Sequence, residues 1–283
     1  YKRQMMKRTK INRAKQFQDI VKFELIKFFR SRKIKASFVL TVVITLIIYA
    51  IPSLLGESSA QQPDVTNYTI NFIQFLSTLI LISVTLFGGD SLTSDFQDKT
   101  GYTLFTNPIS RTSLLFGKFT AASITLTFVT GLYYLITSAF SYIRYSALPP
   151  NLFLSFIFVG LFAIALLSIS FTISSLFKGS SLSYISFFFI FFLVFPLLDY
   201  FLLTMELKPW WSVTFAAGIA IFILEVPYPK DQIIEIPSLF VPGQSQTITN
   251  FIPEVSLSLG IFFVYIIVGL MTSMLLFKRK EMT

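Results

Sequence analysis

The sequence predicts an all-α membrane protein with six transmembrane helices, an N-terminal amphipathic interface helix and an outer re-entrant or interfacial element before the last helix. Three observations lead to this fold class. The 283 residues are 54% hydrophobic and only 13% charged, whereas a soluble domain carries about twice that share of charge. Six apolar stretches are each long enough to cross a bilayer, which takes about 20 helical residues. The basic residues are concentrated on one side of those stretches.

The predicted spans are the long apolar runs at residues 36–55, 70–89, 119–143, 152–177, 182–204 and 255–277. Only the fifth contains a charged residue, Asp199. Unpaired backbone groups are costly in hydrocarbon, so runs of this length must form helices.

A seventh apolar run, Trp210 to Leu224, is short for a span and lies between Lys208 and Glu225. Six spans place both termini on the same side of the membrane, whereas seven would separate them. We therefore expect this run to be a re-entrant or interfacial element of the outer leaflet, with its Trp pair at the headgroups. The proline-rich residues around it, within 205–254, predict an outer loop.

The positive charge follows the positive-inside rule. Residues 1–35 hold 13 of the 23 Lys and Arg, and only Arg144, Lys208 and Lys230 fall in the segments assigned to the other side. This asymmetry predicts a multi-pass protein of the cell membrane with both termini in the cytoplasm. The net charge of +9 is therefore explained by topology, and we expect no nucleic-acid partner.

The residue content excludes several kinds of site. The chain has no Cys and no His, which excludes thiol nucleophiles, Ser-His triads and His-ligated zinc; we expect no catalytic and no metal residues. No phosphate-binding loop of the form GxxxxGK[ST] is present, because Gly117-Lys118 precedes Phe119. An aspartyl dyad of Asp90 and Asp199 is excluded, because the two lie at opposite ends of spans about 30 Å long.

The N-terminal 35 residues predict a helix that lies on the membrane surface. Apolar residues fall at helical spacing on one face: Phe17, Ile20, Val21, Leu25, Phe28 and Phe29. Most of the basic residues lie off that face, which is typical of a helix in the cytoplasmic headgroup layer. The helix could be a lipid anchor, a docking element or both.

The polar stretch from Asp90 to Lys118 interrupts two apolar runs on the cytoplasmic side. It has turn residues at Thr100-Gly101, and from Pro108 it predicts a short helix that enters the third span. From composition alone, an ordinary solvated loop is an equally good interpretation.

Together these features resemble the permease subunits of type-2 ABC exporters (ABC-2 type membrane proteins). The residues that carry the resemblance are an acidic position at Asp95 or Asp98, Lys99, the Thr100-Gly101 turn, Pro108-Ile109-Ser110-Arg111 and Lys118, together with the basic helix and the six spans. The sequence leaves open which Asp takes the acidic position.

The resemblance implies a permease domain over residues 36–283, with a coupling loop at 90–118 that docks on a cytoplasmic ABC ATPase. It implies that the N-terminal helix packs beside this loop through Phe17, Val21, Glu24, Leu25 and Phe28. A second permease copy or paralogue would complete the translocation path. The chain itself would bind no cofactor and catalyse no reaction, whereas ATP and Mg would bind the partner ATPase.

Other functions fit parts of the sequence. An ion channel or a secondary transporter would work without an ATPase, although such proteins usually carry ionisable residues at mid-membrane; a structural scaffold also fits the hydropathy. Hydroxyl side chains in the spans could line a pathway or bond to their own helices: Thr41, Thr45, Thr78, Ser83 and Thr85. Asn67-Tyr68-Thr69 matches the N-glycosylation acceptor pattern.

Overall fold

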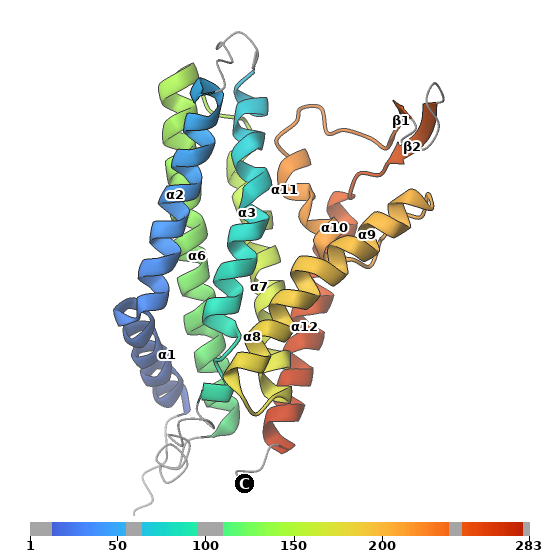
Figure 1. The fold of residues 1–283 in the computed structure, drawn as a ribbon. Helices are drawn as coiled ribbons and strands as arrows, with labels where there is room; N and C mark the ends of the chain where they lie inside the picture. Colours follow the sequence, from blue (N-terminus) through green and yellow to red (C-terminus); the bar gives the residue numbers. More distant parts are fainter. Residues whose placement is uncertain (1–12, 55–63, 95–109, 238–244, 280–283) are drawn as a thin grey trace, which may run out of the picture.

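The structure, a computed structural model, describes residues 13–54, 64–94, 110–237 and 245–279 (Figure 1). Its elements are α1 (Arg13–Arg30), α2 (Arg32–Leu54), α3 (Val65–Gly88), α6 (Arg111–Tyr145), α7 (Leu152–Leu176), α8 (Ser180–Phe189), a π-helix (Ile190–Val194), α9 (Phe195–Thr204), α10 (Val213–Ala217), α11 (Ile219–Phe222), β1 (Gln232–Pro237), β2 (Ser245–Asn250) and α12 (Val255–Arg279). Within these described residues, six helical stretches are long and apolar enough to cross a membrane, as predicted. The fifth joins α8, the π-helix and α9.

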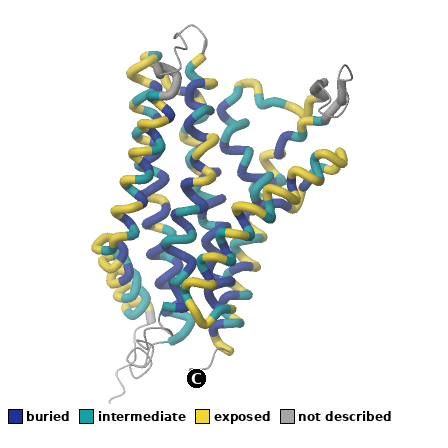
Figure 2. The backbone as a smooth tube through the Cα atoms, in the orientation of Figure 1, coloured by how far each residue is buried: buried dark blue, intermediate teal, exposed yellow. Residues whose placement is uncertain are grey.

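The centre of the bundle is formed by α3, α6 and α7, and α2, the fifth span and α12 pack around them (Figure 2). Large side chains of the central helices, such as Phe72, Leu79 and Phe171, are fully buried. The outer helices expose aliphatic side chains such as Ile47 of α2 and Ile267 of α12. A bundle that is apolar outside as well as inside fits a hydrocarbon surrounding.

Helices α7 and α12 pack closely through small residues. A Cβ atom added at Gly269 would lie 2.5 Å from Oγ of Ser168, so the glycine sets the helix separation. The Ser168 hydroxyl donates to the Tyr265 carbonyl at 2.9 Å, and the Thr172 hydroxyl donates to the Gly269 carbonyl at 2.8 Å. These bonds satisfy polar groups where no water is available.

Helix α6 is longer than a bilayer requires. Its 35 residues extend about 52 Å at about 1.5 Å per residue, against a hydrocarbon core of about 30 Å. The helix begins after Ser110, whose Oγ accepts from the Ser113 amide at 3.1 Å and caps the N-terminus. The short helix predicted from Pro108 and the predicted span 119–143 are thus one continuous helix from Arg111 onward.

The fifth span bends, and α9 leans away from α3 (Figure 1). Pro196 stands at the start of α9, directly after the π-helix. Proline lacks the amide hydrogen for an intrahelical bond and its ring crowds the preceding turn, so the chain widens into a π-helix there. The bend separates the second half of this span from the central helices.

Residues 210–224, predicted to be re-entrant or interfacial, form the short helices α10 and α11. They pack against α7, with α10 also against α9 and α12, and α11 against α3. Val213, Ile219 and Leu224 are fully buried, whereas 62% of Trp210 is exposed. Burial of these short helices inside the bundle favours the re-entrant arrangement over an interfacial one.

The proline-rich segment before α12 contains a hairpin that was not predicted from the sequence. Strands β1 and β2 are antiparallel, with Gln232 opposite Asn250 and Pro237 opposite Ser245. Near its base, Asp231 accepts from Lys208 at 3.2 Å and from the Ile252 amide at 2.6 Å. Burial, with nearby carboxylates such as that of Asp231, raises the pKa of Tyr228 to about 12.

Helix α1 lies at the end of the bundle where α12 also ends, which we call the terminal end (Figure 1). It packs mainly on α6. On the predicted apolar face, Phe28 is buried, and Phe17 and Val21 are partly buried. Phe29 lies at the edge of that face: it is 45% exposed, and its ring packs edge-on against Phe128 of α6 at 5.8 Å between centroids.

Candidate functional site

A buried ion pair joins three segments at the terminal end. Nζ of Lys118, in α6, lies 3.2 Å from Oε1 of Glu24, in α1, and donates to the Ser91 carbonyl at 3.0 Å just after α3. Only 2% of the Lys118 side chain and 8% of the Glu24 side chain are exposed. Burying a charge is costly unless it is paired. The two residues therefore fix α1 against the start of α6 and the end of α3.

Close packing supports this ion pair. A Cβ atom added at Gly117 would lie 2.5 Å from Cγ2 of Ile20, so only glycine lets α1 approach α6 this closely. The ring of Phe28 packs edge-on against Phe87 of α3 at 5.5 Å between centroids. One face of α1 is thus packed against both helices that flank the polar stretch.

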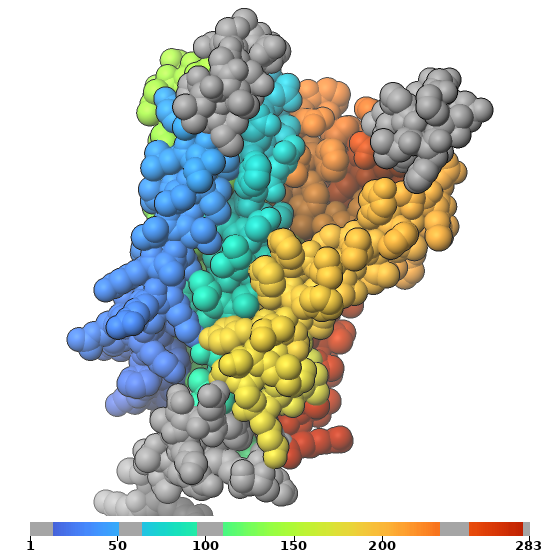
Figure 3. Space-filling view, in the orientation of Figure 1, coloured from blue at the N-terminus to red at the C-terminus, as the bar shows by residue number. Residues whose placement is uncertain are grey.

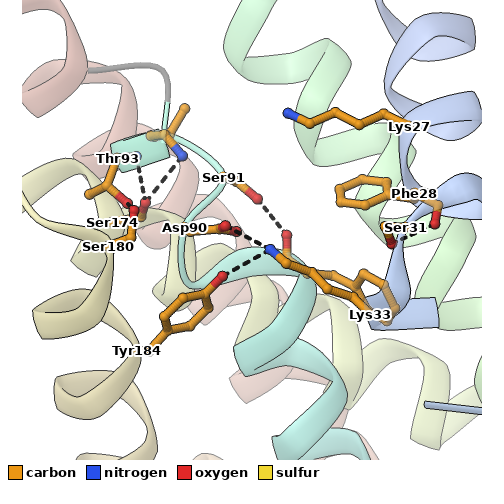
Figure 4. Close-up of polar contacts among 12 residues, drawn as sticks. Lys27, Phe28, Ser31, Lys33, Asp90, Ser91, Thr93, Ser174, Ser180 and Tyr184 are labelled. Atoms are coloured by element: carbon orange, nitrogen blue, oxygen red, sulfur yellow. Dashed lines mark hydrogen bonds and ion pairs between the residues drawn. The ribbon is translucent and has the colours of Figure 1, made fainter. Parts of the chain in front are cut away.

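A second polar cluster joins the start of α2 to α3 and α8 (Figure 4). Nζ of Lys33 donates to Oδ2 of Asp90 at 2.6 Å and to the Tyr184 hydroxyl at 2.8 Å. Lys33 and Asp90 are partly exposed, at 31% and 20% of their side chains. Solvent partly screens such a pair, so its contribution to the free energy of unfolding is small. Its main effect is to position the start of α2 against the end of α3 and α8.

The chain that leaves α3 is held by α7 as well. The Leu92 and Thr93 amides donate to Oγ of Ser174 at 3.1 and 3.2 Å, and the Thr93 hydroxyl donates to Ser180 at 3.2 Å (Figure 4). The described residues that follow α3 are therefore anchored to α7 and α8.

On the far side of that stretch, Arg111 braces α6 against α12. Its guanidinium donates to the Phe277 carbonyl at 3.3 Å and to the Lys278 carbonyl at 2.9 Å. The last carbonyls of a helix lack intrahelical partners and carry partial negative charge. Arg111 therefore caps the C-terminal end of α12.

A family model described as ABC-2 family transporter protein matches residues 18–282, nearly the whole chain. The chain belongs to the ABC-2 transporter family. No curated protein matches it.

As an ABC-2 permease, the chain is a multi-pass membrane component of an ABC transporter, a class whose permeases work with ATPase subunits. The resemblance stated from the sequence is therefore correct.

Two candidate coupling residues form contacts within the bundle: Arg111 with the α12 terminus, and Lys118 with Glu24. The others lie outside the described residues: Asp95, Asp98, Lys99, Thr100, Gly101 and Pro108.

The structure places the candidate pathway residues of the permease in different surroundings. The Thr41 and Thr45 hydroxyls are buried and donate to carbonyls of their own helix at 2.8 and 2.9 Å. The Thr85 hydroxyl also bonds to its own helix. Ser83 is buried, and among the described residues its hydroxyl has no partner. Thr78 lines a cavity between α3, α7, α10 and the fifth span.

Two relationships could not be found by sequence reasoning. Glu24 and Lys118 were both candidates, but nothing in their spacing indicated that they pair. Asp199 is 92% buried beside α10, where its Oδ2 accepts from the Thr214 hydroxyl, and nothing in the spacing of these two residues indicated the contact. Asn67, the candidate glycosylation residue, lies exposed in the first turn of α3.

Proposed function

We propose that the chain is one permease of an ATP-driven exporter and that its terminal end docks a separate cytoplasmic ATPase. The observation that carries this proposal is the buried ion pair between Glu24 and Lys118. It ties the N-terminal helix to both helices that flank the polar stretch, so a push on this stretch would reach three helices together.

The terminal end would act as a transmission element. Bonds at Ser174 hold the chain after α3, and Arg111 holds the start of α6 against α12. Because both ends of the polar stretch are braced, movement of a docked ATPase would be passed to α3 and α6 as a rigid-body shift. The candidate contact residues for the ATPase are Asp95, Asp98 and Lys99.

The remaining parts of the exporter would be supplied by partners. ATP and Mg would bind the ATPase, since the chain has no phosphate-binding loop. A second permease copy or paralogue would complete the path, and the exposed apolar faces of α2, α9 and α12 offer surface for it as well as for lipid.

The cytoplasmic assignment of the terminal end rests on the 13 basic residues of positions 1–35. The export direction rests on the family resemblance.

The test is purification of the tagged chain from its native host in mild detergent, with mass spectrometry of co-purified proteins and an ATPase assay. Wild type is compared with a variant that carries Asp95→Lys and Asp98→Lys. Asp64→Lys is the matched control, because Asp64 is an exposed carboxylate at the opposite end of α3. We expect an ABC ATPase with wild type and with the control, and its loss from the double variant.

A different result would favour the alternatives. If no ATPase accompanies wild type and the purified chain alone moves ions into vesicles, the chain works as a channel or a secondary transporter. If the double variant retains the ATPase and full coupled hydrolysis, the docking site lies elsewhere.

A further inference from the structure

A cavity of about 440 Å³ lies between α3, α7, α10 and the bent fifth span. Thr78 lines one side and Asp199 and Thr214 another, and the aromatic rings of Phe162, Phe191 and Phe192 form much of the remaining wall. Sites for small organic ligands have volumes of about 300–1,000 Å³ and walls that are mainly apolar with a few polar groups. The cavity matches that description.

The cavity follows from the bend of the fifth span. Pro196, which starts the bend, is itself one of the lining residues. Figure 3 shows α9 diverging from α3 on this face of the molecule, with the α10–α11 segment behind the opening. A straight fifth span would pack along α3 and fill this space.

One carboxylate in the cavity wall lacks a full set of partners. Asp199 is 8% exposed, and its Oδ2 accepts from the Thr214 hydroxyl, which in turn contacts Ser212 at 2.8 Å. Its Oδ1 has no hydrogen-bond partner among the described residues. No Lys or Arg in the described part of the chain pairs with it. A buried carboxylate costs free energy unless a partner satisfies it, and inside a membrane protein this points to function.

The chemistry of the wall selects the class of ligand. No group of three or more Asp or Glu that could hold a metal occurs among the described residues, and the chain has neither His nor Cys. A single carboxylate among aromatic faces instead suits an organic cation, because the charge pairs with the carboxylate while the rings attract it further. An apolar portion of the same molecule would contact the phenyl walls.

We propose that this cavity binds amphiphilic organic cations, with the cationic group beside Asp199 and the apolar part against Phe162, Phe191 and Phe192. The protein by itself has this binding site, whether or not an ATPase is attached. That the bound cation is cargo of the transporter is a step that rests on the proposed function.

The test is binding of radiolabelled methyltriphenylphosphonium to the purified chain in phosphatidylcholine nanodiscs, with empty nanodiscs as the background. The neutral competitor is triphenylphosphine oxide, which has nearly the same shape without the charge. We expect saturable binding of about one cation per chain, and competition by the neutral compound at least about tenfold weaker, which corresponds to about 1.4 kcal/mol. Asp199→Asn should weaken cation binding by a similar factor.

Glu206→Gln is the matched control, because it removes one exposed carboxylate outside the cavity and should leave binding unchanged. Phe192→Ala should weaken binding several-fold. If Asp199→Asn fails to fold, the comparison of the cation with its neutral analogue on wild type still decides. The proposal is overturned if binding is not saturable, if the neutral compound competes equally, or if Asp199→Asn binds like wild type.

The two proposals fail in different experiments. Absence of an ATPase from the wild-type pull-down would contradict the exporter function and leave the nanodisc result intact. Absence of cation binding in a chain that retains its ATPase would contradict only the cation site.

Discussion

Lys118 of α6 and Glu24 of α1 form a buried ion pair, with 3.2 Å between Nζ and Oε1. Because the Lys118 ammonium also donates to the Ser91 carbonyl, one charge holds together α1, α6 and the chain that leaves α3. This relationship joins the N-terminal segment to the permease bundle.

Removing one partner of this pair should destabilise the protein strongly. Lys118→Met removes the buried partner of Glu24 and leaves the carboxylate to the more distant, exposed Lys27, which should cost about 3–5 kcal/mol, whereas Glu24→Leu combined with Lys118→Met removes both buried charges and should recover most of that loss. Thermal unfolding in detergent, followed by size-exclusion chromatography, measures the difference. Lys27→Met is the control, since its Nζ lies 3.8 Å from Glu24 but its side chain is 52% exposed. Equal stability of Lys118→Met and Lys27→Met would contradict the prediction.

Two glycines in the bundle should respond differently to alanine. Gly269→Ala brings a methyl group to 2.5 Å from Oγ of Ser168 and should destabilise the α7–α12 contact by about 1–3 kcal/mol. Gly160→Ala meets nothing within 4 Å among the described atoms and should be neutral or slightly stabilising. The same unfolding assay compares them. A larger loss for Gly160→Ala than for Gly269→Ala would show that the helix spacing is set by other residues.

Arg111 should protect the end of α12. Arg111→Gln removes the guanidinium that donates to the Phe277 and Lys278 carbonyls, so the last turn of α12 should fray. Amide hydrogen exchange should become faster in residues near 275–279 and stay unchanged in α7. Arg30→Gln, which removes an exposed basic residue of α1, serves as the control. Unchanged exchange at the α12 terminus would mean that the cap is dispensable.

The orientation can be measured directly, because the chain has no Cys and every introduced thiol is unique. Glu206→Cys, just after α9, and Lys278→Cys, in the last turn of α12, both place a thiol at an exposed position. The C-terminal ends of α9 and α12 point to opposite ends of the bundle (Figure 1). A membrane-impermeant maleimide should label Glu206→Cys on intact cells, and Lys278→Cys only after the cells are opened. The reverse pattern would invert the proposed topology.

Much of the fold could be predicted because each span satisfies its own backbone within one continuous apolar segment. The six spans, the amphipathic α1 and the unusual run from Trp210 to Leu224 were all visible in local composition. The π-helix before Pro196 and the β1–β2 hairpin were not, because both depend on what packs around them. The apolar positions of α1 follow helical spacing, but spacing alone did not show that Phe28 packs on Phe87 of α3 while Phe29 packs on Phe128 of α6.

The sequence by itself determined the class of the protein, the number of spans and the family, since hydrophobicity, charge asymmetry and the loop residues from Asp95 to Lys118 are all read along the chain. Only the tertiary structure decided which charges meet. Glu24 pairs with Lys118, Lys33 with Asp90, and Asp199 with the hydroxyl of Thr214 in a cavity. The physical reason is that a helix fixes each side chain's direction locally, while the partner across the bundle depends on how distant segments pack.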